Sequence, residues 1–437
     1  MSRPIWLMPA LLLLSLTPLP PERPAQPPSD DVERYVLPNG LIVLTKERPD
    51  PDSVAINIAV RAGSRDEDET TNGAAHFMEH MFFQGTPRRP SSLEIDRPIT
   101  SRGGSLNAST QWELITFNAV VRSADVPAAL DVLADILLHS TFDPEALEKE
   151  RRVVLQELNA RLNSPSTRGS DVFFQTVFAQ HPARHLPGGS RETVLTISRD
   201  DLLAFRQRWF LANNMAIAVV GNIAPAEAVR LVEYYFGAFP AGELPPRATA
   251  THAFPSERTL ATVNAGSYQA HVLLGVPGPN LRDPDRYAMA VLDAAIDDAG
   301  RRLFTEIRDR RGLAYSVGSA WVGLTDAGVW LTSAGVDPEN VELVTELILA
   351  EMRRLREEPL TAAELEEAKS YLEGRSVLGL ETNLGQARRF SSQEILGVRE
   401  PIAAYLAHIH AVTAEDVQRV AQRFFDLENY TRVVVAP

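Results

Sequence analysis

The sequence contains no cysteine among its 437 residues. This absence excludes disulfide bonds, a thiolate nucleophile and cysteine-held metal, so any metal site must be built from histidine and carboxylate side chains. Basic residues are outnumbered by acidic ones, 43 against 57, which gives a formal net charge of −14. A nucleic-acid partner requires a basic face, so this charge balance argues against one.

Long hydrophobic runs are also missing after the first residues, so we expect no membrane span in the mature chain. At the start, Arg3 precedes a run from Ile5 to Leu16 that is apolar apart from Pro9 and Ser15. Twelve residues fit the hydrophobic region of a secretory signal better than a membrane span. The proline-rich residues that follow are typical of a tether. We therefore expect residues 1–31 to be a signal peptide and tether, and the chain to be exported to the periplasm. An uncleaved N-terminal anchor is the alternative.

From Val32 onward the pattern is globular, and the second half repeats the first. Residues 197–220 recur as residues 412–435 at a constant offset of 215, without a gap. Strands and helices are mixed rather than strictly alternating, which favours an α+β fold. We expect two homologous domains, residues 32–240 and 255–437, each a mainly antiparallel sheet with helices packed on one face. Glycine, proline and threonine gather between Pro240 and Pro255, which indicates the junction.

One stretch of the first half has an unusual spacing of histidines. The pair Thr71-Asn72 can cap a helix that Gly85 can end. Within this helix His76 and His80 stand four residues apart, which places both imidazoles on one face with Glu79 beside them. Two neutral imidazoles can share one Zn²⁺, and a neighbouring carboxylate can take a proton from a metal-bound water. Histidine pairs also occur four apart by chance, so the rest of the chain must decide.

A hydrolytic zinc site needs a third protein ligand and an open position for water. A second expected helix, Pro144 to Leu162, offers Glu150 and Glu157, which lie two turns apart on one face. The second half has Ala368 and Arg375 at the corresponding places, so only the first half carries this set. Judged by spacing alone, an ordinary charged surface helix is the better interpretation of Pro144 to Leu162.

The HxxEH motif of residues 76–80, followed by residues 150–157 with the sequence ERRVVLQE, resembles the pitrilysin family of zinc metallopeptidases. The resemblance covers nearly the whole chain from Val32, including its paired halves. It implies that His76, His80 and Glu157 hold one Zn²⁺ per chain.

The same resemblance assigns roles to two further carboxylates and to an expected strand. Glu79 is implied to be the general base on a zinc-bound water, and Glu150 to orient the site from behind the ligands. Asn107 and Ala108 resemble the family's edge strand, where a substrate peptide is bound as an added β-strand.

A second signature of the family is found in the second half. Arg308 and Tyr315 match an arginine and a tyrosine seven residues apart that help to hold the substrate carbonyl and the developing oxyanion. Read without the family, Arg308 would be a charge on a surface helix and Tyr315 a core aromatic residue.

The function implied by the resemblance is a zinc endopeptidase that hydrolyses short or unfolded peptides in a clamshell chamber. One chain of this length holds half of such a chamber, so Arg308 and Tyr315 are expected to serve the zinc of a partner chain. A homodimer is the expected assembly, and a heterodimer with a related subunit is the alternative. The rival function is a non-catalytic scaffold, or the partner subunit of a related heterodimeric peptidase. The natural peptide is left open.

Overall fold

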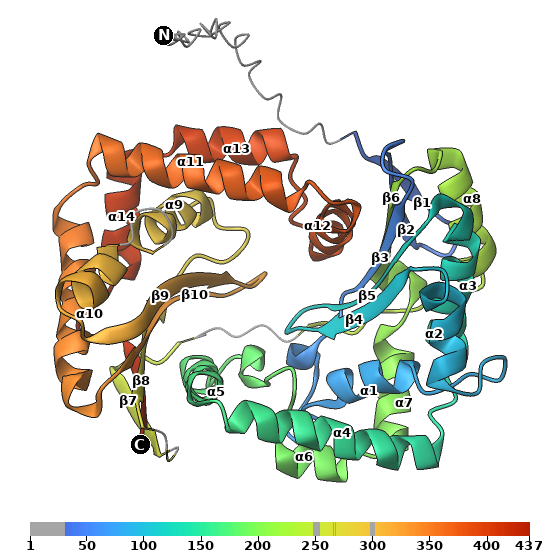
Figure 1. Cartoon of the computed structure of the whole chain (residues 1–437), viewed down its shortest axis with the longest axis horizontal. Helices are drawn as coiled ribbons and strands as arrows, with labels where there is room; N and C mark the ends of the chain where they lie inside the picture. The colour runs from blue at the N-terminus through green and yellow to red at the C-terminus, as the bar shows by residue number, and fades with distance from the viewer. Residues whose placement is uncertain (1–30, 248–253, 265, 267, 298–301) are drawn as a thin grey trace, which may run out of the picture.

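The structure is a computed structural model that describes residues 31–247, 254–264, 266, 268–297 and 302–437. The first 30 residues, which hold most of the expected signal and tether, lie outside the described residues, as do residues 248–253 within the expected junction. Among the described residues, no helix is both long and apolar enough to cross a membrane. Two sheets lie in one curved molecule, each with its own set of helices (Figure 1).

The first sheet has six strands in the order β1-β2-β6-β3-β5-β4. Neighbouring strands are antiparallel except for the parallel pair β2 and β6. The strands are β1 (Glu33–Val36), β2 (Ile42–Glu47), β3 (Val54–Val60), β4 (Ser105–Thr110), β5 (Ile115–Val121) and β6 (Met215–Gly221).

The second sheet has five strands in the order β7-β11-β8-β10-β9, again with a single parallel pair, β7 and β11. The strands are β7 (Thr259–Asn264), β8 (Ala270–Pro277), β9 (Ala314–Gly323), β10 (Gly328–Val336) and β11 (Thr431–Ala436). Because the order matches that of the first sheet without β1, the predicted α+β class with two homologous sheets is confirmed.

The helices follow the same repeat. The offset of 215 relates α7 (Arg199–Trp209) to α14 (Ala414–Phe424), and each begins with a capping box, formed by Ser198 with Asp201 and by Thr413 with Asp416. The other helices of the first half are α1 (Ala74–Phe82), α2 (Ser92–Thr100), α3 (Val126–His139), α4 (Pro144–Leu162), α5 (Pro165–Val177), α6 (Arg191–Thr196) and α8 (Pro225–Phe236). Those of the second half are α9 (Arg286–Ile296), α10 (Val341–Glu357), α11 (Ala362–Gly379), α12 (Asn383–Leu396) and α13 (Ile402–Ala411).

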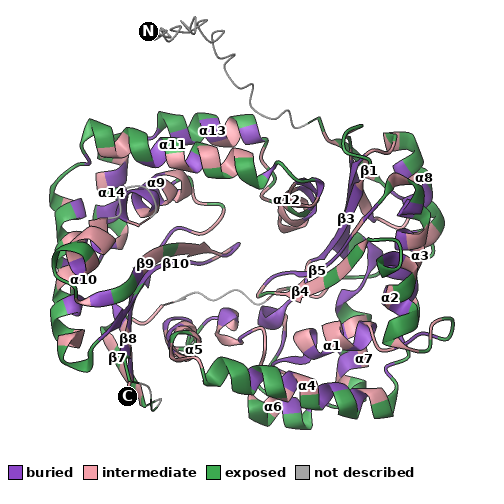
Figure 2. Cartoon of the chain, viewed as in Figure 1, coloured by how far each residue is buried: buried purple, intermediate pink, exposed green. Residues whose placement is uncertain are grey.

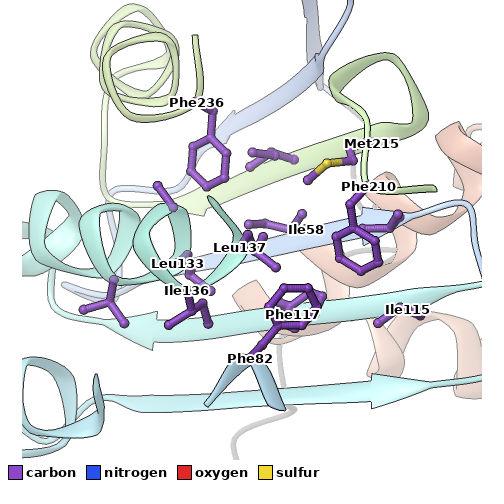
Figure 3. Packing of buried hydrophobic residues seen from close by; sticks show 14 of the residues in the cluster. Ile58, Phe82, Ile115, Phe117, Leu133, Ile136, Leu137, Phe210, Met215 and Phe236 are labelled. Atoms are coloured by element: carbon purple, nitrogen blue, oxygen red, sulfur yellow. The ribbon is translucent and has the colours of Figure 1, made fainter. Parts of the chain in front are cut away.

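The main core of the first half lies between its sheet and helices α1, α3, α7 and α8. Phe82 of α1 meets Phe117 of β5 and Phe210 with ring centroids 5.4 and 5.0 Å apart (Figure 3). Burying each such ring stabilises the fold by about 1.5–3 kcal/mol. The outer faces of α4 and α6 remain exposed, whereas the central strands β3 and β6 are buried (Figure 2). This core fixes α1 rigidly against the sheet.

The opposite face of each sheet receives one helix from the other half. Helix α12 packs on β3 and β6, where Phe390 joins a small apolar cluster and Asn57 donates a 2.7 Å hydrogen bond to Ser391. Helix α5 packs on β8 and β11, and a Cβ added at Gly169 would lie 2.5 Å from Leu273. The sequence predicts helices on one face of each sheet, and the structure adds one helix on the other face. Because each added helix comes from the opposite half, this exchange ties the two halves together (Figure 1).

A buried ion network also joins the halves. The turn between β9 and β10 brings Thr325 and Asp326 to the first half, where Arg65 donates to Asp326 at 2.7 Å and to Glu113 at 2.6 Å. The backbone N–H of Thr325 donates to Glu113 at 2.9 Å, and His181 Nε2 lies 3.3 Å from Asp326. Burial opposes ionisation of Asp326, but hydrogen bonds from His181 and Arg65 hold the pKa of Asp326 below its usual value. The network fixes the tip of the β4–β5 hairpin.

Candidate metal centre

Helix α1 presents its polar side chains on the one face that the core does not cover. His76, Glu79 and His80 are half-buried, whereas the other residues of the helix are buried: Ala74, Ala75, Phe77, Met78, Met81 and Phe82. This pattern follows the 3.6-residue period of a helix and leaves the three polar groups together. The helix ends three residues before the expected Gly85.

The start of α1 differs from the sequence prediction, because neither Thr71 nor Asn72 is the capping residue. The cap is Gly73, whose φ of 101° suits glycine and which has no side chain to accept a capping hydrogen bond. Glu67 takes over this role: its carboxylate accepts hydrogen bonds from the backbone N–H of Gly73 at 2.8 Å and of Ala75 at 2.7 Å. Burial raises the pKa of Glu67 to about 8, against the effect of these hydrogen bonds. No spacing rule in the sequence links Glu67 to this helix.

Three side-chain atoms converge at the exposed face of α1. His76 Nε2 and His80 Nε2 lie 3.3 Å apart, and each lies 3.6 Å from Glu157 Oε2 of α4. In a tetrahedral zinc site with bonds of about 2.0–2.1 Å, neighbouring donors are about 3.3–3.5 Å apart. Among the described residues this is the one His and carboxylate group compact enough to hold a metal. The donor set therefore fits Zn²⁺ and leaves a fourth position open.

The surroundings of the two histidines suit metal binding in different ways. Burial, aided by the charges of His80 and Arg161, lowers the pKa of His76 to about 4, so its ring is neutral at pH 7. His80 Nδ1 lies 3.2 Å from Glu150 Oε2, and Glu150 is buried. A proton on Nδ1 donated to this carboxylate leaves the Nε2 lone pair of His80 directed at the metal position.

Helix α4 places both glutamates because its start is firmly set. Pro144 stands at the first helical position, and Asp143 accepts hydrogen bonds from the backbone N–H of Glu145 and Ala146. The helix packs on α1 and spans the residues expected from the sequence. Glu150 and Glu157 lie two turns apart on this helix. The buried Glu150 lies near Nδ1 of His80, and the exposed Glu157 lies near the Nε2 atoms of both histidines.

Glu79 connects the metal centre to the edge of the first sheet. Its carboxylate accepts a 2.5 Å hydrogen bond from the hydroxyl of Thr110, the last residue of the edge strand β4. Burial raises the pKa of Glu79, although Thr110 and His80 act in the other direction. Asn107 and Ala108 lie on this strand, which has no strand on its outer side within the described residues. No spacing in the sequence predicts the hydrogen bond between Thr110 and Glu79.

Arg308 and Tyr315 lie in the second half. Arg308 is in the π-helical segment η5 (Phe304–Arg310), and its guanidinium lies 5.1 Å from the ring centre of Tyr315 at the start of β9. Tyr315 is 76% exposed, so it is no core aromatic residue. Within the described parts of the chain, no hydrogen bond or ion pair joins this pair to His76, His80 or Glu157.

Comparison with known proteins follows the division into halves. Residues 42–186 match the family described as Insulinase (Peptidase family M16), and residues 196–372 match the Peptidase M16 inactive domain. An uncharacterized zinc protease of Streptomyces coelicolor is 34% identical over 399 residues, which cover 90% of this chain and 86% of the relative. The mitochondrial-processing peptidase subunit beta of Lentinula edodes is 29% identical over 410 residues, covering 90% and 87%.

A crystal structure of a protease from Helicobacter pylori shares the fold, with a TM-score of 0.88 at 24% identity, and covers 94% of this chain and 100% of that one. The solved structure shares the fold, and the names of the relatives together with the donor set indicate the class of zinc protease-like proteins. The chain belongs to peptidase family M16, the pitrilysin type suggested by its HxxEH motif. The inactive-domain match ends in the region where Ala368 stands in place of a glutamate.

Proposed function

We propose that the chain is a zinc-dependent endopeptidase that hydrolyses short or unfolded peptides. The observation that supports the proposal is the set of distances among His76 Nε2, His80 Nε2 and Glu157 Oε2, which are close to the donor spacings of a tetrahedral zinc site. We propose one Zn²⁺ per chain at this position. When bound, the ion supplies a Lewis acid that activates water and polarises the scissile carbonyl.

The carboxylates beside the donors have separate tasks. Glu79 takes a proton from the attacking water and passes it to the leaving amine. Burial raises the pKa of Glu79, which favours the protonated carboxyl between the two steps. The hydrogen bond from Thr110 fixes the direction of the Glu79 carboxylate. Glu150 holds the ring of His80 in the tautomer and orientation that present Nε2.

Substrate binding is assigned to the edge of the first sheet. A peptide added alongside β4 would be held by backbone hydrogen bonds next to Asn107 and Ala108, and would run past Glu79. This mode requires an extended chain and reads few side chains, so it suits short or unfolded peptides. Most segments of a folded protein are already paired or packed and would have to unfold locally to bind in this way.

The assembly we propose is a clamshell homodimer in which residues 32–240 form the zinc-bearing domain and residues 255–437 the domain without metal ligands. The exposure of Tyr315 supports a role for Arg308 and Tyr315 at the partner's zinc. A heterodimer with a related subunit is the alternative. The apolar start of the sequence supports export to the periplasm through a signal peptide.

The test is the pair of variants Glu79→Gln and His80→Ala, assayed with an unstructured peptide and for zinc content. Glu79→Gln should keep its zinc and lose cleavage by at least about 100-fold, because only the general base is removed. His80→Ala should lose both zinc and cleavage. Glu148→Gln, an exposed change on α4, is the matched control and should behave as the unmodified chain. Normal turnover in Glu79→Gln would remove Glu79 from its role, and a purified protein without zinc would favour the scaffold function.

A further inference from the structure

A cavity of about 400 Å³ lies between helix α7 and the residues that lead into α1. The two helices pack against each other in the first half (Figure 1). The cavity wall is made of Arg65, Asp66, Glu67, Asp68, Thr71, Ala74, Asp201, Ala204, Phe205, Arg208, Trp209, Pro246 and Arg247. This wall includes none of the proposed zinc ligands, and the volume lies within the range of about 300–1,000 Å³ that is usual for ligand pockets. The cavity is therefore a candidate binding site separate from the metal centre.

Several charged groups of the wall are already balanced by their neighbours. Arg65 belongs to the ion network that joins the halves, and Arg247 Nη2 donates to Asp66 at 2.8 Å. Burial raises the pKa of Glu67 to about 8, so this carboxyl is mostly protonated at pH 7. The charged groups that a ligand would meet are therefore the remaining three, Asp68, Asp201 and Arg208.

Arg208 supplies the positive charge of the wall. Its guanidinium lies over the ring of Trp209, 5.3 Å from the ring centre, and Trp209 lines the same cavity. Among the described residues, Arg208 has no hydrogen bond and no ion pair. Stacking on an aromatic face leaves the in-plane N–H groups of a guanidinium free, and their fork matches the two oxygens of a carboxylate. Arg208 is thus held at the wall with its donors available.

The two carboxylates lie away from Arg208 along the chain. Asp201 precedes Arg208 by seven residues, which places both on one face of α7, about 10.5 Å apart along the helix axis. Asp201 accepts the N–H and the hydroxyl of Ser198 with Oδ2 alone, and Asp68 uses only Oδ1 in its own turn. Each carboxylate therefore keeps one oxygen that has no partner within the described residues and can accept a hydrogen bond from a cation.

The surface between the opposite charges is apolar and is formed by Ala74, Ala204, Phe205 and Pro246. Such a surface favours small aliphatic groups over an inorganic ion. An extended peptide spans at most about 3.3–3.6 Å per residue, so three residues cover about 10 Å. This length matches the separation of Asp201 and Arg208 along α7.

We propose that this cavity binds a zwitterionic tripeptide with small side chains, its ammonium group at Asp201 and Asp68 and its carboxylate at Arg208. A guanidinium pairs with a carboxylate through two parallel hydrogen bonds, which gives both strength and direction. The site goes beyond the proposed cleavage, because it requires neither zinc nor Glu79. Free amino acids and the ends of longer chains share part of this chemistry, so the test must separate them from the tripeptide.

The test is calorimetric titration of the full-length Glu79→Gln chain, which should not cleave the probe. The probe is trialanine, compared with its N-acetylated form, its C-terminal amide and free alanine. Trialanine should bind at least about 10-fold more tightly than either blocked form, because each block removes a hydrogen-bonded charge. Free alanine is too short to reach both ends of the site and should bind at least about 10-fold more weakly.

Two variants locate the binding. Arg208→Gln and Asp201→Asn should each weaken binding of trialanine about 10-fold or more, and the asparagine keeps an oxygen for the hydrogen bonds from Ser198. Arg208 is exposed, so its replacement keeps the test valid if Asp201→Asn does not fold. Thermal unfolding is measured on each sample.

The controls are Arg191→Gln, an exposed change on α6 with the same loss of charge, and Gln207→Ala, which alters the wall of a neighbouring cavity. Neither residue lines the proposed site, so both variants should bind as the parent chain does. Absence of binding, equal binding of trialanine and a blocked form, or binding that Arg208→Gln leaves unchanged would overturn the proposal. A loss in Gln207→Ala as large as that in Arg208→Gln would place the peptide in the neighbouring cavity and overturn it too.

Discussion

Replacement of Glu150 tests how the metal ligands are held in place. Glu150 is 7% exposed, and its carboxylate lies 3.2 Å from Nδ1 of His80. Glu150→Ala removes this partner without touching a proposed ligand. Loss of such an orienting carboxylate typically weakens metal binding 10- to 100-fold, which corresponds to about 1.4–2.7 kcal/mol. Glu150→Gln keeps an oxygen acceptor but loses the charge, so a smaller loss of about 0.5–1.5 kcal/mol is expected.

The assay is competition for zinc between the protein and a chromophoric chelator at pH 7. The predicted order of affinity is the unmodified chain, then Glu150→Gln, then Glu150→Ala. Glu148→Gln is the control, because it lies on the same helix but faces solvent and pairs with Arg151. Unfolding curves recorded without metal would show whether the variants differ in stability alone. If Glu150→Ala bound zinc as tightly as the unmodified chain, the proposed role of this carboxylate would be refuted.

Three further predictions concern the junction, the base and the assembly. Asp326→Asn should lower the free energy of unfolding by about 1–3 kcal/mol at pH 7, because Arg65 loses an ionised partner. Folding lowers the pKa of Asp326, so the stability that its charge contributes is complete above the ordinary pKa of 3.8 and is lost as pH falls through the folded pKa. Urea unfolding of the unmodified chain and of Asp326→Asn should therefore differ less at pH 3 than at pH 7. An equal difference in the free energy of unfolding at the two pH values would contradict this role of Asp326. Thr110→Val should lower kcat about 10-fold or more while KM and zinc content stay unchanged, whereas Thr110→Ser should keep the kcat of the unmodified chain. Equal kcat values for the unmodified chain and both variants would show that Thr110 does not position Glu79. Mixing Glu79→Gln chains with Tyr315→Phe chains should restore part of the lost cleavage if sites are shared between chains, and no recovery would confine each site to one chain.

Much of the fold could be predicted because its signals are local or repeated. The capping residues Ser198 and Thr413 recur at the same offset that relates α7 to α14, so the duplication is visible in the sequence. The face shared by His76 and His80 follows from helical periodicity, and the start of α4 follows from Asp143 and Pro144. These features depend on neighbours within one helix.

The contacts that the sequence did not predict join different elements of the structure rather than neighbours within one helix. Asn57 and Ser391 are separated by 334 residues, and a hydrophobic pattern on α12 does not say which sheet it covers. The bond between Thr110 and Glu79 depends on how α1 crosses the end of β4, and Glu67 reaches the start of α1 through a loop. Such contacts are set by tertiary packing, for which a single sequence carries no period or spacing.

The central claim is that His76, His80 and Glu157 hold one zinc ion between two helices. Its most direct test is the zinc content per chain, measured by elemental analysis after gel filtration, for the unmodified protein, Glu157→Gln and the control Glu148→Gln. The account predicts one zinc per chain in the unmodified protein and the control, and little or none in Glu157→Gln. Full zinc content in Glu157→Gln, or none in the unmodified protein, would contradict it.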